Sequence, residues 1–561
     1  MIGVVVAIIA FNFNGVIRNK GTDRIFVLSG RNEVDSEGSL ETDDTVSVQS
    51  NVSESGVATQ SLQTADDIDT SKWDLSKVDI VYDKTGIPVP VPKGFTASSV
   101  ESEMYVNGLN EVHTGTKTEL ELSSTGDYPW TKMENGAWKS GNIGVANSTS
   151  TLSSNEFEIQ DDGGALSLNW SASSNGCYAY LYAVITNVDT NEEIRSPNLG
   201  GSSLGSTVSI LKYVTYEKIL QPGKYKVDIM YTKLENGASN TADAGCVKSA
   251  SIINFDESGQ SQLIEHKYGG FVIYSGSESV TDENKDDAQK NRNQWVWIPV
   301  TDVSKLYKTN SNGRIQSRLY IYTANGRYEN SYSYEPGLVS DYDIERNYMR
   351  EHLQGYNSQK FLQEMQTQLK ETIDSISKYG GFWIGRYETG DISKSKPVIR
   401  KMNTDISYQT WYDMYTKLKR IETTENTKTS MIWGCLWDET LQWLVDSGRL
   451  DQYELLISTG FGNYYDTTFE YTMTNGNTST KQFRRLTKIP AGSSEYTNTN
   501  NIYDMAGNIF YWTLESTGTM SRRIRGGDTS DYGVNESISY RSGYSPNTRY
   551  SVGFRAYMYI K

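Results

Sequence analysis

The feature that most constrains this chain is a set of glycines near its C-terminus: Gly507, Gly526, Gly527 and Gly553. Glycine allows backbone angles and close approaches that a Cβ forbids, so these positions predict a tight frame. Between Gly527 and Gly553 the chain is rich in Asp, Ser, Tyr, Asn, Gly and Thr and contains no Lys and no Cys. A rigid frame around a polar, tyrosine-rich loop is typical of a binding surface.

The motifs that contain these glycines resemble a known signature. They occupy residues 501–512 (Asn-Ile-Tyr-Asp-Met-Ala-Gly-Asn-Ile-Phe-Tyr-Trp), 523–527 and 553–555, with further matches upstream at 295–299, 380–388 and 433–438. The set resembles the formylglycine-generating enzyme (sulfatase-modifying factor) family over roughly residues 269–561. The resemblance implies a C-type-lectin-like fold, which the variable proteins diversified by retroelements share. We therefore expect an α+β class, with an all-β jelly-roll sandwich inserted into the lectin-like domain.

The reactive residues of that family are missing. Its enzyme branch uses a C-terminal pair of cysteines to bind copper, but residues 440–561 contain no cysteine, and Cys435 stands alone among tryptophans. A related branch uses a histidine-ligated iron, whereas His113, His266 and His352 are scattered and have no metal-ligand spacing. We expect a non-catalytic protein. The alternative is an enzyme of the formylglycine-generating type with altered chemistry, which needs reactive groups that converge near Trp512.

Calcium is a second open question. The resemblance places Asp504, Gly507 and Ile509 at positions where the family binds Ca²⁺, but Tyr511 stands where the family has a glutamate and cannot supply an anionic oxygen. The alternative is that Asp504 turns the backbone through its own hydrogen bonds. No other cofactor is expected.

The amino-acid composition limits the classes of binding partner. The net charge of -16 at pH 7 argues against nucleic acid, whose phosphates need Lys and Arg. With 39 Tyr, 48 Gly and only 11 Pro, the chain suits a strand- and loop-rich extracellular module. Its 561 residues are too many for one core and suggest two or three domains.

The N-terminal 70 residues differ in composition from the rest of the chain. Residues 1–20 begin with a short apolar run, which we interpret as an export or anchor segment that attaches the protein to a membrane or pilus; the alternative is a buried strand. Residues 21–70 become polar and acidic, with few large apolar residues, and predict a disordered linker.

We assign residues 71–107 and 269–561 to the lectin-like domain and residues 108–268 to the inserted β-sandwich. Within the insert, Leu166–Trp170 and Tyr178–Val184 alternate apolar and polar residues, which predicts strands. Several of its segments resemble jelly-roll modules of the galactose-binding or MAM type. Cys177 and Cys246 flank candidate strands, and we expect either that these strands are neighbours joined by a disulfide or that the two thiols are independent.

Three helical patterns occur in the lectin-like half, at residues 358–378, 437–447 and, more weakly, 408–421. Gly380 and Gly381 are expected to stop the first of these helices.

The predicted binding residues lie between Gly527 and Gly553. Their types are those that antibody paratopes favour, because Tyr gives contact area at low entropic cost while Ser and Asn adapt their hydrogen bonds. They are Asp528, Ser530, Asp531, Tyr532, Asn535, Ser537, Ser539, Tyr540, Ser542, Tyr544 and Ser545. We expect one exposed patch above buried Arg525, Trp512 and Phe554. The Arg-Gly-Gly motif (525–527) and the Gly-Phe-Arg motif (553–555) should mark neighbouring strands that hold both ends of the segment. Its ligand would be a protein or glycan on another cell or particle, bound by a protein that is secreted, or displayed on a cell or virus particle.

Overall fold

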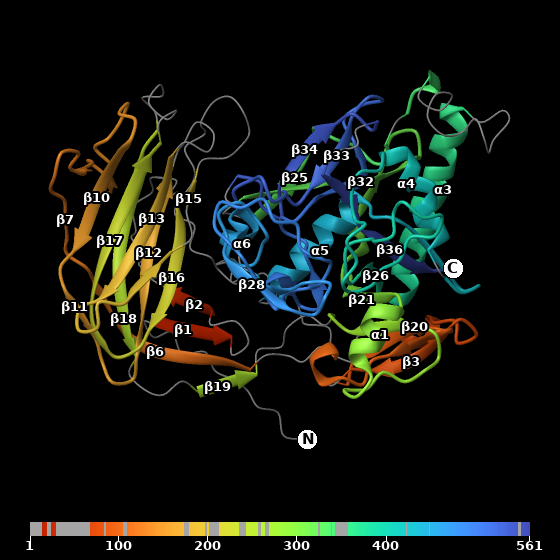
Figure 1. The fold of residues 1–561 in the computed structure, drawn as a ribbon, viewed down its shortest axis with the longest axis horizontal. Coiled ribbons are helices and arrows are strands. Elements are labelled where there is room, and N and C mark those ends of the chain that lie inside the picture. The colour runs from red at the N-terminus through yellow and green to blue at the C-terminus, as the bar shows by residue number, and fades with distance from the viewer. Residues whose placement is uncertain are drawn as a thin grey trace, which may run out of the picture. The chain divides into compact units, whose positions relative to one another are not determined.

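The computed structural model describes residues 14–19, 24–29 and 68–561, apart from 84–85, 105–108, 173–178, 197–198, 201–212, 235–242, 256–259, 264–268, 324–325, 338, 343–356, 422, 448, 451, 534 and 548–550. The chain divides into two compact units (Figure 1). Unit 1 comprises Met1–Thr59 and Gly108–Ile264, and unit 2 comprises Gln60–Asn107 and Glu265–Lys561. Among the described residues, no helix is both long and apolar enough to cross a membrane.

Unit 1 is a jelly-roll-like β-sandwich of two sheets (Figure 1). One sheet has the order β16-β12-β18-β6-β1-β2, with β8, β9 and β19 off this path, and the other has the order β14-β13-β17-β10-β7, with β11 and β15 off it. The first sheet contains β1 (Asn14–Asn19), β2 (Arg24–Ser29), β6 (Leu109–Glu119), β8 (Thr131–Lys132), β9 (Trp138–Lys139), β12 (Gly164–Ala172), β16 (Val214–Leu220), β18 (Gly245–Phe255) and β19 (Gln260–Leu263). The second contains β7 (Leu122–Ser123), β10 (Ser148–Ser154), β11 (Phe157–Ile159), β13 (Ala179–Asn187), β14 (Glu193–Arg195), β15 (Leu199–Gly200) and β17 (Gly223–Lys233).

The alternation seen in the sequence forms the core of unit 1. In β13, Leu181 and Ala183 are fully buried, while Tyr180 and Tyr182 between them stay partly exposed. Successive side chains of a strand point to opposite faces of the sheet, so this pattern places one face of β13 in the core. The strands expected at Leu166–Trp170 and Tyr178–Val184 are confirmed over the described residues.

The N-terminal region differs from the expectation. Residues 14–19 form β1, which pairs with both β2 and β6, so part of the expected anchor segment is a strand of the sandwich. Part of the expected linker forms β2. The other residues before position 68 lie outside the described part of the chain.

The cysteine expectation is also wrong in part. The strand that begins after Cys177, β13, belongs to one sheet, whereas Cys246 lies on β18 of the other sheet, so the two strands are not neighbours. Cys246 is a free, half-buried thiol, and Cys177 itself lies outside the described residues.

Unit 2 is built around a six-stranded sheet of order β27-β36-β26-β21-β20-β5 and a four-stranded sheet of order β34-β33-β32-β35. The six strands are β5 (Phe95–Ala97), β20 (Val272–Ser275), β21 (Gln294–Pro299), β26 (Gly381–Gly385), β27 (Thr427–Met431) and β36 (Ala556–Ile560). The four are β32 (Phe510–Ser516), β33 (Arg522–Arg525), β34 (Arg541–Tyr544) and β35 (Val552–Phe554). Two-stranded ribbons pair β3 (Val78–Tyr82) with β4 (Pro88–Pro92), β22 (Tyr307–Thr309) with β23 (Ile315–Ser317), β24 (Tyr320–Thr323) with β25 (Gly326–Glu329), β28 (Phe469–Thr472) with β29 (Thr478–Lys481), and β30 (Asn498–Thr499) with β31 (Ile502–Tyr503).

The described helices of unit 2 include the three predicted ones. They are α1 (Lys285–Asn291), α3 (Ser358–Tyr379), α4 (Trp411–Lys417), α5 (Gly434–Asp446) and α6 (Gln452–Leu456). Gly380 ends α3 in the left-handed conformation, as expected from its sequence position.

The predicted fold class is wrong. We expected an α+β, C-type-lectin-like domain, but strands greatly outnumber helices and are spread over several sheets in both units. The predicted helices are present, yet they are few beside a much larger number of strands. Many of these strands are only two to four residues long and polar, as in Thr478–Lys481, so they leave no strong alternation in the sequence.

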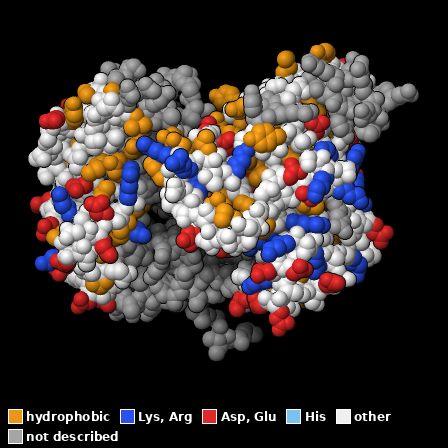
Figure 2. All heavy atoms as spheres, viewed as in Figure 1, with side chains coloured by type: hydrophobic (Ala, Val, Ile, Leu, Met, Phe, Trp, Pro, Cys, Tyr) orange, Lys and Arg blue, Asp and Glu red, His pale blue; other side chains and the backbone are white. Residues whose placement is uncertain are grey.

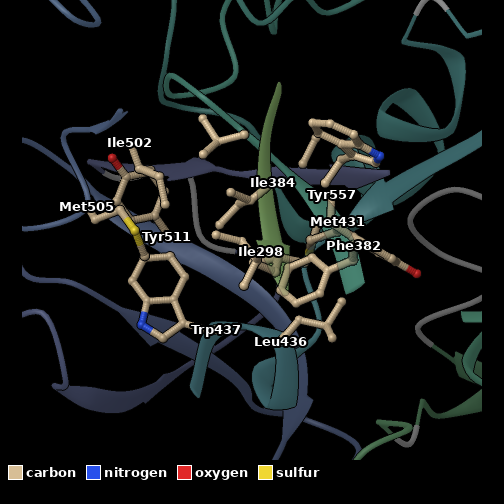
Figure 3. Close-up of a cluster of buried hydrophobic side chains, with 14 of the residues drawn as sticks. Ile298, Phe382, Ile384, Met431, Leu436, Trp437, Ile502, Met505, Tyr511 and Tyr557 are labelled. Carbon is tan, nitrogen blue, oxygen red and sulfur yellow. The ribbon is translucent and has the colours of Figure 1, made fainter. Parts of the chain in front are cut away.

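The core of unit 2 lies between the six-stranded sheet and the elements that carry the C-terminal segment. Figure 3 shows Trp437 of α5 beside Met505 and Tyr511, and Ile384 and Ile298 from neighbouring strands of the sheet. The rings of Trp437 and Tyr511 lie 5.4 Å apart between centroids. Such contacts pack the C-terminal strands tightly against the core of unit 2.

Candidate ligand-binding surface

The polar C-terminal segment connects two strands that pair directly. Arg525, the last residue of β33, faces Arg541, the first residue of β34. The segment therefore leaves and re-enters one sheet at a single place. The expectation that the Arg-Gly-Gly and Gly-Phe-Arg motifs mark neighbouring strands is wrong, because β32 lies between β33 and β35.

The glycine frame is confirmed. Gly527 has a φ of +72°, and a Cβ there would lie 2.1 Å from the carbonyl oxygen of Glu536. At Gly507, also at φ +72°, a Cβ would lie 2.3 Å from the carbonyl oxygen of Asn463. No other residue fits these positions without movement of the backbone.

Four buried charges hold both ends of the segment. The Nη1 of Arg525 lies 3.3 Å from Glu515, and its Nη2 pairs with Asp438. The Nη2 of Arg541 lies 2.9 Å from Asp438, and its Nε lies 2.8 Å from Glu515. Both carboxylates thus bridge both arginines, and this geometry fixes the spacing of β33 and β34. Sequence reasoning missed Arg541, which sits within the polar segment.

The predicted binding residues fall into three groups. Asp528 and Ser537 are buried. Partly buried ones are Asp531, Tyr532, Asn535, Ser539, Tyr540 and Ser542, and exposed ones are Ser530, Tyr544 and Ser545. Arg525, Trp512 and Phe554 are fully buried, as expected. The segment is thus less exposed than the single open patch that the sequence suggested.

Several of the polar side chains make internal turns. Asp528 accepts hydrogen bonds from the backbone N–H and the hydroxyl of Ser530, at 2.7 and 2.6 Å. The hydroxyl of Ser539 donates to the carbonyl of Leu455 at 2.6 Å. These groups shape the loop, which leaves the tyrosines as its larger contact elements.

Three tyrosines of the segment pack against aromatic neighbours. Tyr532 meets Tyr465 in a T-shaped pair at 5.6 Å. Tyr540 and Tyr544 approach Phe510 with ring centroids 6.1 and 6.5 Å away. Such support holds a tyrosine in place while leaving part of its ring free.

A second segment, which sequence reasoning missed, extends this surface. Tyr544 pairs with Arg522, Arg522 with Ser516, and Ser516 with Tyr334. Tyr334 and Tyr544 are 40% and 38% exposed, and Tyr332 is 74% exposed. With about 4.8 Å between strands, the two ends of the row lie about 14 Å apart. The signal was present, because residues 328–334 repeat the Tyr, Ser and Asn composition of the C-terminal segment.

Two carboxyls of the segment lie together. Burial, with the neighbouring Glu536, raises the pKa of Asp531 to about 9. Burial also raises the pKa of Glu536. Among the described residues, no group of three or more His, Cys, Asp or Glu side chains is arranged to hold a metal ion.

The three residues proposed for calcium are buried within unit 2. Asp504 accepts hydrogen bonds from the N–H of Gly492 at 2.7 Å and the hydroxyl of Thr497 at 2.6 Å, and burial raises its pKa to about 6. The carbonyl of Gly507 accepts from the N–H of Ile509 at 2.8 Å. The carboxylate of Asp504 thus binds residues 492 and 497 in the interior of unit 2, and calcium at this place stays a prediction.

The thiol that an enzyme would need is shielded. Cys435 is buried at the start of α5, where its N–H donates to Glu335 at 3.2 Å. Burial, with the charge of Glu335, holds the pKa of this thiol well above its ordinary value, so it is protonated and unreactive near neutral pH.

Comparison with known proteins gave no family. No family model matches the chain, and no curated protein matches it. The resemblance to the formylglycine-generating enzyme family is therefore not supported.

Solved structures match parts of the chain at low similarity. Treponema denticola variable protein 1 is 14% identical with a TM-score of 0.21, over 32% of this chain and 84% of that one. TmCBM61, solved with beta-1,4-galactotriose, is 7% identical with a TM-score of 0.16, over 24% and 88%. The K1 cleaved adhesin domain of Lys-gingipain from Porphyromonas gingivalis W83 is 12% identical with a TM-score of 0.19, over 25% and 98%. Similarity this low assigns no function.

Proposed function

We propose that this chain is a non-catalytic ligand-binding or adhesion protein that acts outside the cell, on a cell surface or on a virus particle. Its recognition surface is the C-terminal segment Asp528–Ser545 together with the neighbouring residues Tyr332 and Tyr334. The ligand is a protein or a glycan.

One observation carries this proposal: exposed tyrosines stand at both ends of a cross-strand row on a sheet held by buried ion pairs. A rigid floor lowers the entropic cost of binding, because the tyrosines are already placed before the ligand arrives. Tyrosine also contributes area and a hydroxyl to either a protein surface or a sugar ring.

The test uses the purified full chain on an array of defined oligosaccharides and on an array of secreted and cell-surface proteins. We expect at least one ligand whose binding is lost when Tyr334 and Tyr544 are both replaced by Ala. The control is Tyr82→Ala, which removes a tyrosine that is 59% exposed on a different ribbon of unit 2. Equal binding by all three proteins, or no ligand on either array, would contradict the proposal.

A further inference from the structure

Unit 2 contains a basic cavity that lies apart from the C-terminal segment. Its volume is about 500 Å³, and its lining includes Lys396, Arg400, Lys419 and Arg420, with Val398 and Ile421 as apolar wall. This volume falls within the range of about 300–1,000 Å³ that small-molecule sites occupy. Its basic lining is unexpected in a protein with a net charge of -16.

Two anchored segments form the cavity. One is residues 396–400, where the N–H of Ile399 donates to the side chain of Asn293 at 2.9 Å and Val398 pairs with Gly390. The other is the turn Leu418–Arg420, which continues α4 directly. Figure 2 shows Lys and Arg side chains gathered over the part of unit 2 that carries α3 and α4 in Figure 1. The cations are therefore held on ordered backbone.

The acidic groups near the cavity have other partners. Lys419 pairs with Glu364, so one of the four charges is compensated. Asp391, which interacts electrostatically with Arg400, accepts from Lys394 at 2.8 Å and from Asn403 at 3.1 Å. Within the described residues, which exclude position 422, no ion pair involves Lys396, Arg400 or Arg420.

One hydrogen-bond donor of Arg400 has no acceptor among the described residues. Its Nε–H is buried and makes no hydrogen bond among the described residues. Buried polar groups are almost always hydrogen-bonded, and a donor on a cation gains most from an anionic oxygen. The lining thus offers positive charge and an apolar wall in one place.

We propose that this cavity binds a sugar-sized ligand that carries a sulfate, phosphate or carboxylate group. Arg400 and Arg420 bind the oxyanion, Lys396 adds charge at the entrance, and Val398 and Ile421 contact the apolar face of the ring. A long polyanion such as nucleic acid is disfavoured, because the acidic protein repels it beyond the cavity. This site goes beyond the proposed function and does not depend on it.

The test is isothermal titration of the full chain, at low and at high salt, with four probes: inorganic sulfate, inorganic phosphate, glucuronate and galactose 6-sulfate. Neutral galactose is the reference. We expect a charged sugar to bind more tightly than neutral galactose and more tightly than the free ion, with weaker binding at high salt. Stronger binding of the free ions than of the charged sugars would assign the cavity to an inorganic anion and overturn the sugar-sized ligand.

Variants locate the binding. Arg400→Gln and Arg420→Gln should each weaken binding by about tenfold, the scale of one charge-assisted hydrogen bond. Lys396→Gln should weaken it less, and Lys394→Gln should leave it unchanged, because Lys394 is two residues away and pairs with Asp391. Unchanged binding in both arginine variants, or no binding by any charged probe, would overturn the proposal. Circular dichroism of each variant shows that a loss is not due to unfolding.

Discussion

The two units reach a buried core by different means. In unit 1, β13 and β17 alternate buried and more exposed residues over most of their length, and the core side chains of β13 are Ala, Leu and Ile. In unit 2, fully buried arginines such as Arg386, Arg525 and Arg555 lie among the tryptophans, and Arg386 lies 2.5 Å from the buried Glu103. Apolar alternation builds a regular sandwich, whereas paired charges fix the irregular segments of unit 2. The comparison teaches that regularity can be read from local sequence, but an irregular core depends on distant partners.

The largest effect should come from breaking the charge cluster. Asp438→Ala leaves Arg525 and Arg541 without one of their two acceptors, and loss of one partner of a buried pair typically costs about 3–5 kcal/mol. Urea denaturation, monitored by tryptophan fluorescence, measures this loss in the free energy of unfolding. Asp374→Ala, which removes an exposed partner of Lys370, should cost at most about 1 kcal/mol. Equal costs for both variants would mean that the buried cluster does not hold unit 2.

The matching change in unit 1 removes an apolar side chain. Leu181 is fully buried on β13, and a Leu→Ala change in a core costs about 2–5 kcal/mol. Thermal unfolding of Leu181→Ala should show this loss. Glu193→Ala on the exposed β14 should stay within about 0.5 kcal/mol. A loss as small as that of the control would place Leu181 outside the core.

The third prediction concerns the pH dependence of the stability of unit 2, which contains buried carboxyl groups. Burial, with the charge of Glu515, raises the pKa of Glu335 to about 8, while an unfolded Glu titrates near about 4.3. Between these values only the folded state holds the proton, so stability falls as pH rises, by up to about 1.4 kcal/mol per pH unit for this group.

Denaturation of unit 2 measured from pH 5 to pH 8 tests this. Glu335→Gln, which mimics the protonated carboxyl, should reduce the slope. Glu388 and Asp531, whose pKa values burial raises to about 8 and about 9, keep part of it. Glu329→Gln should leave the slope unchanged, because its ion pairs lower the pKa of that carboxyl. An identical slope in the wild type and in Glu335→Gln would disprove the assignment.

The smallest effect should come from the exposed tyrosine. Tyr544→Ala should change stability by about 0.5 kcal/mol or less, as exposed substitutions usually do. Tyr540→Ala should cost more, since Tyr540 is half-buried against Phe510. Thermal melting compares the stability of the two variants. A larger loss of stability for Tyr544→Ala than for Tyr540→Ala would mean that the Tyr544 ring is part of the core.

Local signals in the sequence predicted the local features. The left-handed conformations of Gly380, Gly507 and Gly527 and the alternation of β13 are properties of the local chain. The close approach at Gly507, by contrast, is to Asn463, which lies far away in the sequence. The fold class was predicted wrongly because the short strands of the two-stranded ribbons produce no periodic pattern in the sequence.

The site was predicted only in part, for a related reason. Arg541 looks like one more polar residue of its segment, yet it pairs with Asp438, 103 positions away. Tyr334 joins the surface through a bridge to Ser516, which no spacing in the sequence reveals. Contacts between distant segments set the exposure of each tyrosine, and one sequence does not contain that information.

The pairing of Arg525 with Arg541 has a practical consequence for protein engineering. Because the polar segment begins and ends at one place in the sheet, a foreign peptide inserted between Asp528 and Ser537 leaves the pairing of β33 with β34 in place. The insert must keep the carbonyl groups of Asp531 and Gly533, which accept from the N–H groups of Tyr465 at 2.8 Å and Ser458 at 3.0 Å. Ile538 must be kept, since its carbonyl accepts from the indole of Trp437 at 3.2 Å. The chain is thus suited to loop grafting, with randomised libraries carried on a scaffold that stays constant.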